Sequence, residues 1–195
     1  IPQGKIGVVQ ACDGKPLPSG RVIARDVDCN FFQDARAFLQ NGGERGPQMK
    51  VIPPGTFRIN PLLFTVDLFD ATDIPQGKVG IVEAHDGNPL PIGRVVAKGI
   101  ECDSFQNAKA FFDGGGERGP QVKIIPPGNY RINPVLFDVR LENVVDIPEN
   151  KIGVVTTKEG VPLPTGEIAG GEVPGHNMFQ DADKFIANGG NKGLQ

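Results

Sequence analysis

The chain of 195 residues has no tryptophan, one tyrosine, two histidines and only three cysteines. Cys12, Cys29 and Cys102 are odd in number and show no CxxC spacing. This pattern argues against a disulfide framework, and a zinc site would need ligands that the sequence does not group. Cys29 and Cys102 occupy equivalent places in an internal repeat, so we interpret them as small half-buried apolar residues. We predict no metal site.

Long apolar runs and charge of one sign are also missing. No apolar stretch is long enough to span a bilayer, and the start of the chain does not resemble a signal peptide. The net charge is −3, and lysines and arginines are mixed with acidic residues throughout. Without a basic stripe, nucleic acid is not expected as a partner. Because the chain begins with Ile1 and not with methionine, we expect it to be part of a longer protein.

Glycine and proline, in contrast, are abundant. The chain has 27 glycines and 18 prolines, and its hydrophobic fraction is 38%. The glycines and prolines are scattered among apolar segments and form no low-complexity block. This distribution indicates many short elements and turns, and it argues against disorder.

An internal repeat organises the sequence. Residues 1–73 align without a gap with residues 74–146, and about 60% of the aligned positions are identical, as expected for a repeat array. A third copy begins at Ile147, needs one inserted residue before Phe179, and stops at Gln195, level with Gln48 and Gln121. We define three modules: residues 1–73 (module 1), 74–146 (module 2) and 147–195 (module 3, incomplete).

Each module is predicted to begin with a turn followed by strands. Gly4, Gly77 and Asn150 are equivalent, and glycine and asparagine exchange most readily where φ is positive. Residues 5–11 and 62–68 are predicted strands, and residues 21–24 a second short strand. Pro54-Gly55 suits the central positions of a type II turn.

One helix of about eleven residues is predicted in each module. Its expected N-caps are Asn30, Asp103 and Asn177, each followed three residues later by a glutamine that completes a capping box: Gln33, Gln106 and Gln180. A glycine pair ends each helix as a left-handed C-cap would. The expected apolar stripe comprises Phe32, Ala35, Phe38 and Leu39, with the equivalents Phe105, Ala108, Phe111, Phe112, Phe179, Ala182, Phe185 and Ile186. The predicted fold class is α+β, mostly β: a stiff tandem array of small β-rich modules, each with one short helix.

No motif indicates catalysis or a cofactor. The glycine-rich residues 42–48 follow the predicted helix, whereas a phosphate loop precedes one, so we interpret them as a helix end; anion binding through Arg45 or Arg118 is the alternative. His85 and His176 are not at equivalent positions, and Cys12 matches His85 without forming a shared nucleophile pair. No serine lies in a nucleophile-elbow pattern. We predict no catalytic, cofactor-binding or metal-binding residues, and no enzymatic activity.

Charged residues recur at equivalent positions and suggest contacts between modules. These residues either pair across module junctions or form solvated surface, since most exposed ion pairs contribute little to stability. They are Arg21, Arg94, Glu44, Glu117, Arg45 and Arg118. Near-identical adjacent modules favour a scaffold over an enzyme, because equal modules present equal surfaces at a regular spacing.

Two kinds of segment resemble a known family. Residues 52–61 (IPPGTFRINP) and 125–134 (IPPGNYRINP), each followed by an apolar strand, and residues 147–157 (IPENKIGVVTT) are similar to sequences of the stomatin–prohibitin–flotillin (SPFH) family. The likeness covers nearly the whole chain and is greatest to amino-terminal repeat modules of bacterial flotillin-like proteins. Neither the SPFH core nor the coiled coil of the family is present in these residues.

The resemblance implies a non-enzymatic scaffold region of a membrane-associated assembly, with no catalytic residues. It implies self-association of the full-length protein into a large homo-oligomer, and membrane attachment through segments absent here. The expected location is the cytoplasmic face of a bacterial membrane, with these residues themselves soluble. A second hypothesis is a peptide- or ligand-binding repeat array that uses exposed strand edges. A third is an enzyme with a site that no motif reveals.

Overall fold

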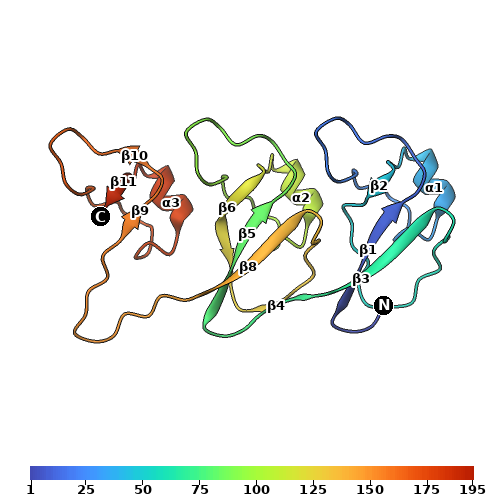
Figure 1. Cartoon of the computed structure of the whole chain (residues 1–195), viewed down its shortest axis with the longest axis horizontal. Coiled ribbons are helices and arrows are strands. Elements are labelled where there is room, and N and C mark those ends of the chain that lie inside the picture. Colours follow the sequence, from blue (N-terminus) through green and yellow to red (C-terminus); the bar gives the residue numbers. More distant parts are fainter.

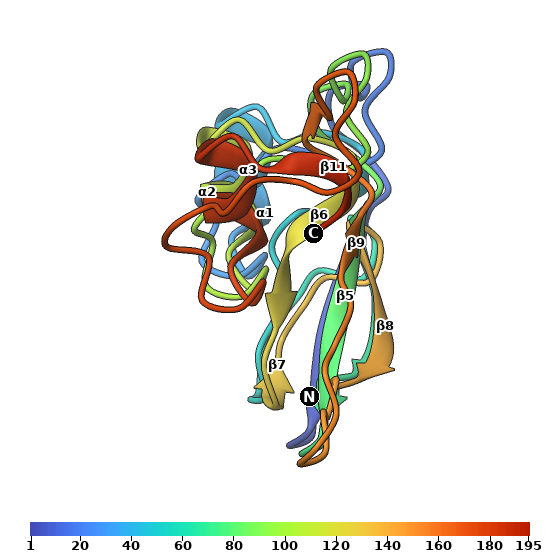
Figure 2. The same ribbon diagram turned by 90° about the vertical axis from the view of Figure 1, so that its left-hand side faces the viewer.

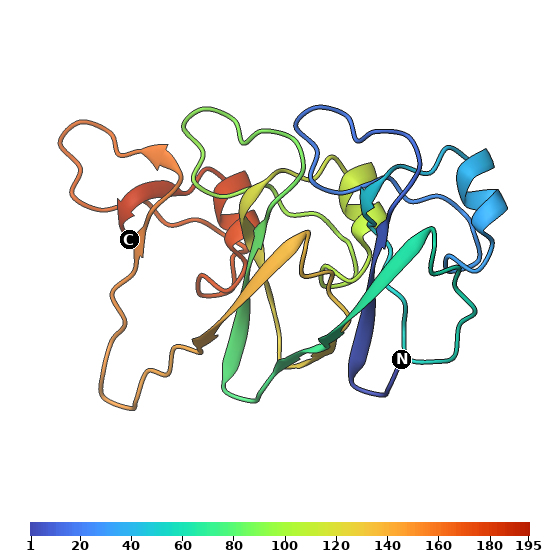
Figure 3. The same cartoon turned by 45° about the vertical axis from the view of Figure 1, so that its right-hand side comes forward.

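Short strands and one short helix recur three times along the chain in the computed structural model, which describes residues 1–195 (Figure 1). Most of the regular structure is β, as predicted. Viewed end-on, the three helices lie on the same side and largely overlap (Figure 2). In an oblique view, the long strands of the first two modules lean the same way (Figure 3). The modules therefore follow one another in nearly the same orientation.

Modules 1 and 2 are each built on a three-stranded antiparallel sheet. In module 1 the order is β2 (Gly46–Pro47), β1 (Lys5–Ala11) and β3 (Phe64–Asp70), with helix α1 (Ala35–Gln40) between β1 and β2 in the chain. In module 2 the order is β6 (Gly119–Ile125), β5 (Lys78–Ala84) and β8 (Phe137–Asn143), with helix α2 (Ala108–Asp113). The short strand β4 (Thr72–Ile74), where the two modules meet, pairs with β7 (Gly128–Tyr130).

Module 3 has helix α3 (Ala182–Ala187) and a smaller sheet with the order β10 (Val161–Pro162), β11 (Asn191–Leu194) and β9 (Thr156–Thr157). Residues 151–155 correspond to most of β1 and β5 but form no strand. Ile152 and Val154 are 90% and 70% exposed there, whereas Ile6 is fully buried in β1. The sequence of module 3 lacks the residues that correspond to β3 and β8, so this stretch has no neighbour to pair with.

Several local predictions are confirmed. The strand at residues 5–11 has the predicted bounds. Gly4, Gly77 and Asn150 have φ angles of 77°, 80° and 66°, so the opening turn is left-handed in all three modules. The glycine after each helix is also left-handed, with φ of 78° at Gly42 and 73° at Gly115. The strand expected at residues 62–68 begins two residues later, at Phe64.

The predicted helix start is wrong. Each helix has only six residues and is capped by Asp34, Asn107 or Asp181, whose side chains accept hydrogen bonds from the first turn. The expected cap, Asn30, begins three consecutive left-handed residues that end at Phe32, with φ of 51°, 51° and 64°. Asp103 and Asn177 begin the same left-handed turn in the other modules. Asparagine and aspartate favour both caps and left-handed backbone, so the sequence signal was ambiguous.

Two other predictions are wrong because these residues bond to distant parts of the chain and do not form the expected local element. Residues 21–24 form no strand, and only Ala24 makes a bridge, with Gln48. Gly55 and Gly128 have φ of 152° and 157°, far from the roughly +80° of a type II turn. Gly128 instead starts β7 and is paired with Ile74, and the Gly55 N–H donates to the Ile1 carbonyl at 3.0 Å.

Phenylalanines form the centre of the first two modules. In module 1 the Phe64 ring lies 5.3 Å from Phe32 and 4.9 Å from Phe38, in edge-on contacts. Phe137 makes the same contacts in module 2, at 5.2 Å from Phe105 and 5.0 Å from Phe111. Of the expected helix stripe, two side chains are exceptions: Leu39 is 47% exposed, and Ala182 is exposed as well.

We expect Gly116→Ala to destabilise the chain by about 1–3 kcal/mol, the usual cost of overpacking a core. A Cβ atom on Gly116 would overlap the buried Phe111 ring. Gly171→Ala is the matched control, because no atom lies within 4 Å of its Cβ position, and it should change stability by less than about 0.5 kcal/mol. Urea denaturation followed by circular dichroism measures both values, and equal stabilities would contradict the packing described.

Candidate functional site at the module junction

A buried carboxylate joins module 1 to module 2. Asp86 lies just after β5 and is 2% exposed. Its Oδ2 accepts hydrogen bonds from the backbone N–H groups of Val22 and Ile23, at 2.8 and 3.1 Å. The same oxygen accepts from Arg21 Nε at 2.9 Å, while Oδ1 accepts from the Gly87 N–H at 2.7 Å. Three of the four donors therefore come from the neighbouring module.

Arg21 is held in place by more than its ion pair. Its Nη2 atom donates to the Ile23 carbonyl at 3.3 Å. Its guanidinium carbon lies 4.5 Å from the ring centroid of Phe112, on helix α2 of module 2. A guanidinium can pair with a carboxylate and stack on an aromatic ring at once, and an ammonium could not provide the same planar contact.

The junction between modules 2 and 3 repeats this arrangement. Glu159, at the position of Asp86, accepts from the N–H groups of Val95 and Val96 at 2.7 and 2.8 Å. It also pairs with Arg94, whose second nitrogen donates to the Val96 carbonyl at 3.1 Å. The longer glutamate side chain makes the same contacts to the preceding module as the aspartate, without the bond that Asp86 makes to its own neighbour, Gly87. Because an equivalent acidic residue binds the equivalent backbone and arginine at both junctions, successive modules are joined in the same way.

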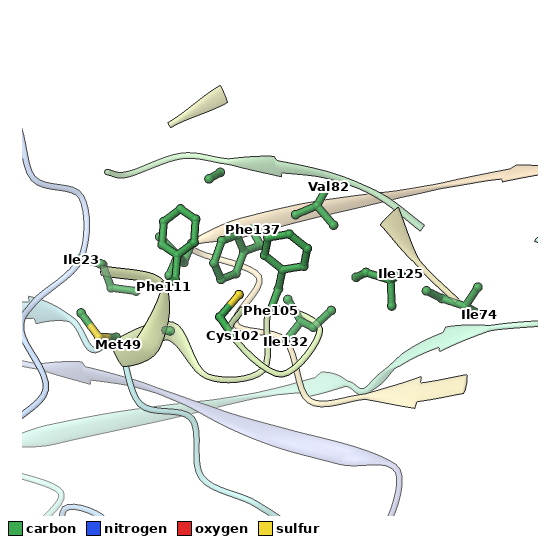
Figure 4. Close-up of a cluster of buried hydrophobic side chains, with 13 residues drawn as sticks. Ile23, Met49, Ile74, Val82, Cys102, Phe105, Phe111, Ile125, Ile132 and Phe137 are labelled. Carbon is green, nitrogen blue, oxygen red and sulfur yellow. The ribbon is translucent and has the colours of Figure 1, made fainter. Parts of the chain in front are cut away.

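Apolar side chains and an amide complete the first junction. Ile23 and Met49 of module 1 belong to the buried cluster of module 2, which contains Phe105, Phe111 and Phe137, and Figure 4 shows them beside the Phe111 end of that cluster. Asn133 Nδ2 donates to the carbonyls of Gln48 and Met49, both at 3.0 Å. The core of module 2 is thus completed by module 1.

The hydrogen bonds at the junction control the acidity of Asp86. Burial alone would raise its pKa, but donation from the N–H of Val22, from Arg21 and from the N–H groups of Ile23 and Gly87 outweighs burial and lowers the pKa below its ordinary value. The carboxylate is therefore ionised in the folded chain, and it is stabilised by the same donors that join the modules.

An open groove lies beside the first junction. It has a volume of about 450 Å³ and its lining is mostly polar, with side chains of both charges that include Asp26, Lys50, Asp103 and Arg131. Lys50 Nζ lies 4.5 Å from the centroid of the Phe31 ring. The mixed charges and the wide opening do not resemble the enclosed apolar pockets of small-molecule sites.

The predicted junction residues divide into three groups. Arg21 and Arg94 do pair across junctions. Glu44 and Glu117 instead act inside their own modules, accepting from the N–H groups of Arg25 and Lys98 at 2.9 and 3.0 Å. Arg45 and Arg118 are exposed and form no salt bridge. The glycine-rich segment around Arg45 is a helix end, as predicted.

Sequence reasoning missed the carboxylates, Asp86 and Glu159. The available signal was an acidic residue at one repeat position, occupied by Asp13, Asp86 and Glu159. An Asp-Gly pair such as Asp13-Gly14 by itself indicates only a turn. That turn is real, because the Asp13 carboxylate accepts the Gly14 N–H at 2.7 Å. The partner of the second carboxylate oxygen depends on the fold, and a turn motif does not reveal it.

The cysteines and histidines have structural partners. Cys29 and Cys102 are buried, not half-buried; burial raises the pKa of each thiol, and the N–H of Phe32 or Phe105 donates to it. In module 3 the equivalent position holds His176, whose Nδ1 accepts the Phe179 N–H at 2.8 Å. His85 Nδ1 lies 3.1 Å from the Val135 carbonyl. Cys12 is exposed.

No group of three or more histidine, cysteine, aspartate or glutamate side chains is placed to hold a metal ion. None of the helices combines the length and the apolar character needed to cross a bilayer. No family model, no curated protein and no solved structure matches the chain.

Asp86→Ala is expected to lower the free energy of unfolding by about 3 kcal/mol, because it leaves a partly buried guanidinium and the buried Ile23 N–H without their acceptor. Asp13→Ala provides the matched control: the residue has the same repeat position but is exposed, so the change should be below about 0.5 kcal/mol. Chemical denaturation of both variants tests the difference, and a neutral Asp86→Ala would refute the role of the carboxylate.

The junction should also weaken in acid. Because the pKa of Asp86 is lowered on folding, the unfolded chain binds its proton more readily. The contribution of Asp86 to stability is therefore complete above the ordinary pKa of 3.8 and is lost as the pH falls through the lower folded value. The difference in unfolding free energy between the natural chain and Asp86→Asn should shrink in that range.

Proposed function

We propose that this chain is a non-enzymatic structural repeat region that acts as a spacer and lateral packing surface in a membrane-associated, flotillin-like assembly. The observation that carries the proposal is the repetition of one junction, with Asp86 and Glu159 each capping the backbone of the preceding module. Modules that are joined in the same way add the same length each time, and a spacer of defined length requires this.

The contacts at the first junction favour a stiff connection. Three kinds of interaction act together: the buried carboxylate, the shared apolar core and the pairing of β4 with β7. Freely hinged domains are joined by exposed linkers that few contacts cross. Here Ile74, at the boundary itself, is 2% exposed and lies in the core of module 2. Bending at this point would break strand pairing and open the core.

The outer strands of the two complete sheets supply the proposed lateral surface. β3 and β8 are edge strands and carry exposed charged residues. Asp138 and Glu142 alternate along β8 with Arg140, which pairs with Glu142 at 3.2 Å. Charged edges oppose uncontrolled strand pairing, so neighbouring copies would pack through complementary side chains and not by sheet extension. This property suits an ordered lateral array.

The assembly itself is proposed from the sequence resemblance. We propose that the whole protein self-associates into a large homo-oligomer, and that segments outside residues 1–195 attach it to the cytoplasmic face of a bacterial membrane. The cysteines support a reducing compartment, because all three are free.

The second candidate is a peptide- or ligand-binding repeat array that uses exposed strand edges. An extended peptide would bind to the edge strands β3 and β8 by strand addition. The exposed charged residues on these strands oppose such pairing, so we favour the scaffold.

Removing one module from the whole protein tests the spacer. Deletion of residues 74–146 joins Asp73 to Ile147 and places Arg21 opposite Glu159, so the charges at the remaining junction still match. Electron microscopy of the protein on lipid vesicles should show assemblies of unchanged symmetry, with the layer beyond the array closer to the membrane by one module.

The same deletion combined with Arg21→Glu is the control, because two acidic residues then meet at the junction and the regular spacing should be lost. Assemblies with an unchanged spacing after the deletion would contradict a spacer role. Dispersed monomers of the natural protein, both in detergent and on lipid, would contradict the scaffold as a whole.

A further inference from the structure

The surface of module 2 that receives module 1 is built from a small set of residues, which we call the receiving face. Asp86 binds Arg21 and the backbone of Val22 and Ile23, Phe112 lies against Arg21, and Asn133 binds the carbonyls of Gln48 and Met49. Leu136, which is fully buried, packs in the cluster that Ile23 and Met49 complete. We call the complementary surface of module 1 the presenting face.

Module 1 has the same receiving face, and it is uncovered. Its residues at the equivalent positions are Asp13, Leu39, Asn60 and Leu63, with Leu62 beside them. These five side chains line one shallow hollow with a volume of about 540 Å³. Leu62 is 87% and Leu39 47% exposed, whereas their counterparts Val135 and Phe112 are partly covered. Leu39 and Leu62 are thus exposed at the place where a neighbouring module covers module 2.

The polar groups of this face are already arranged as in the occupied one. Asn60 Oδ1 accepts the Leu62 N–H at 3.0 Å, as Asn133 Oδ1 accepts the Val135 N–H at 3.0 Å. Asp13 Oδ1 holds the Gly14 N–H at 2.7 Å, as Asp86 Oδ1 holds that of Gly87 at 2.7 Å. In the occupied face Asp86 Oδ2 and Asn133 Nδ2 bind the neighbour, and their counterparts on module 1 have no protein partner.

We infer that the receiving face of module 1 is a docking surface for the presenting face of a further module of this type, one with an arginine at the position of Arg21 and β-branched residues at the positions of Val22 and Ile23. The inference rests on the proposed function and specifies its partner. Charge complementarity and continuity with two existing junctions support it: Asp13 supplies the carboxylate, and the incoming arginine lies over Leu39.

This partner is not module 3 of a second copy of the chain. Within residues 1–195, the presenting faces of modules 1 and 2 are covered by the modules that follow them, which leaves the presenting face of module 3 to consider. There Glu167 and Ala169 replace the arginine and the β-branched residue of Arg21 and Ile23. Glu167 would meet Asp13, and like charges without a bridging cation repel each other. Glu167 therefore opposes end-to-end docking of identical chains.

An extended chain tests the docking surface while keeping the natural chain intact. A second copy of residues 74–146 is placed before Ile1, so that its Arg94 and Val96 face Asp13. In this chain Asp13→Ala should lower the ratio of folded to unfolded protein by about a hundredfold, as Asp86→Ala should, although Asp13→Ala is expected to be neutral in residues 1–195 alone. A neutral Asp13→Ala in the extended chain would overturn the inference.

Two controls separate docking from simple lengthening of the chain. Arg94→Glu in the added copy reproduces the charge of Glu167, and it should make the effect of Asp13→Ala disappear. Sedimentation velocity of residues 1–195 alone should show monomers; oligomers that dissociate on Asp13→Ala would overturn the role given to Glu167. The spacer proposal is judged separately, by the spacing in the assembly, so either idea can fail without the other.

Discussion

The architecture depends on a carboxylate that accepts hydrogen bonds from backbone N–H groups, as the carbonyl groups of a neighbouring strand would. The N–H groups of Val22 and Ile23 point at Asp86 of the next module, and Arg21 neutralises the charge that this arrangement buries. Burying an ionised carboxylate is costly unless hydrogen bonds and an opposite charge compensate, and here both come from the adjoining module. At this junction each module therefore satisfies polar groups of the other, and the two modules are connected in this way.

The apolar contacts follow the same principle. The side chains of Ile23 and Met49, from module 1, pack into the core of module 2. The hydrophobic clusters therefore do not coincide with the repeat boundaries. A module of this size buries little apolar surface by itself, and sharing a core is the usual solution in repeat proteins. The uncovered Leu39 and Leu62 of module 1 show the same surface without a neighbour.

Module 3 shows how far local sequence depends on its surroundings. Residues 151–155 are identical in sequence to residues 5–9 at the start of β1, yet they form no strand, because no counterpart of β3 or β8 is available to pair with them. Helix α3 and its cap do form, since their hydrogen bonds lie within a few residues. Local hydrogen bonds tolerate the absence of tertiary neighbours, whereas strand pairing does not.

The sequence alone determined the repeat, the left-handed opening turns at Gly4, Gly77 and Asn150, the strand at residues 5–11 and the presence of one short helix per module. Each of these depends on spacing or on the backbone preference of a single residue. Only the tertiary structure decided where the helix begins, because Asn30 and Asp34 both suit a cap and the left-handed turn at Asn30 is stabilised by burial of Phe32 and Cys29. It also decided that residues 21–24 form a junction and not a strand. Their hydrogen-bond partner, Asp86, lies more than sixty residues away in the chain, and no local pattern encodes such a contact.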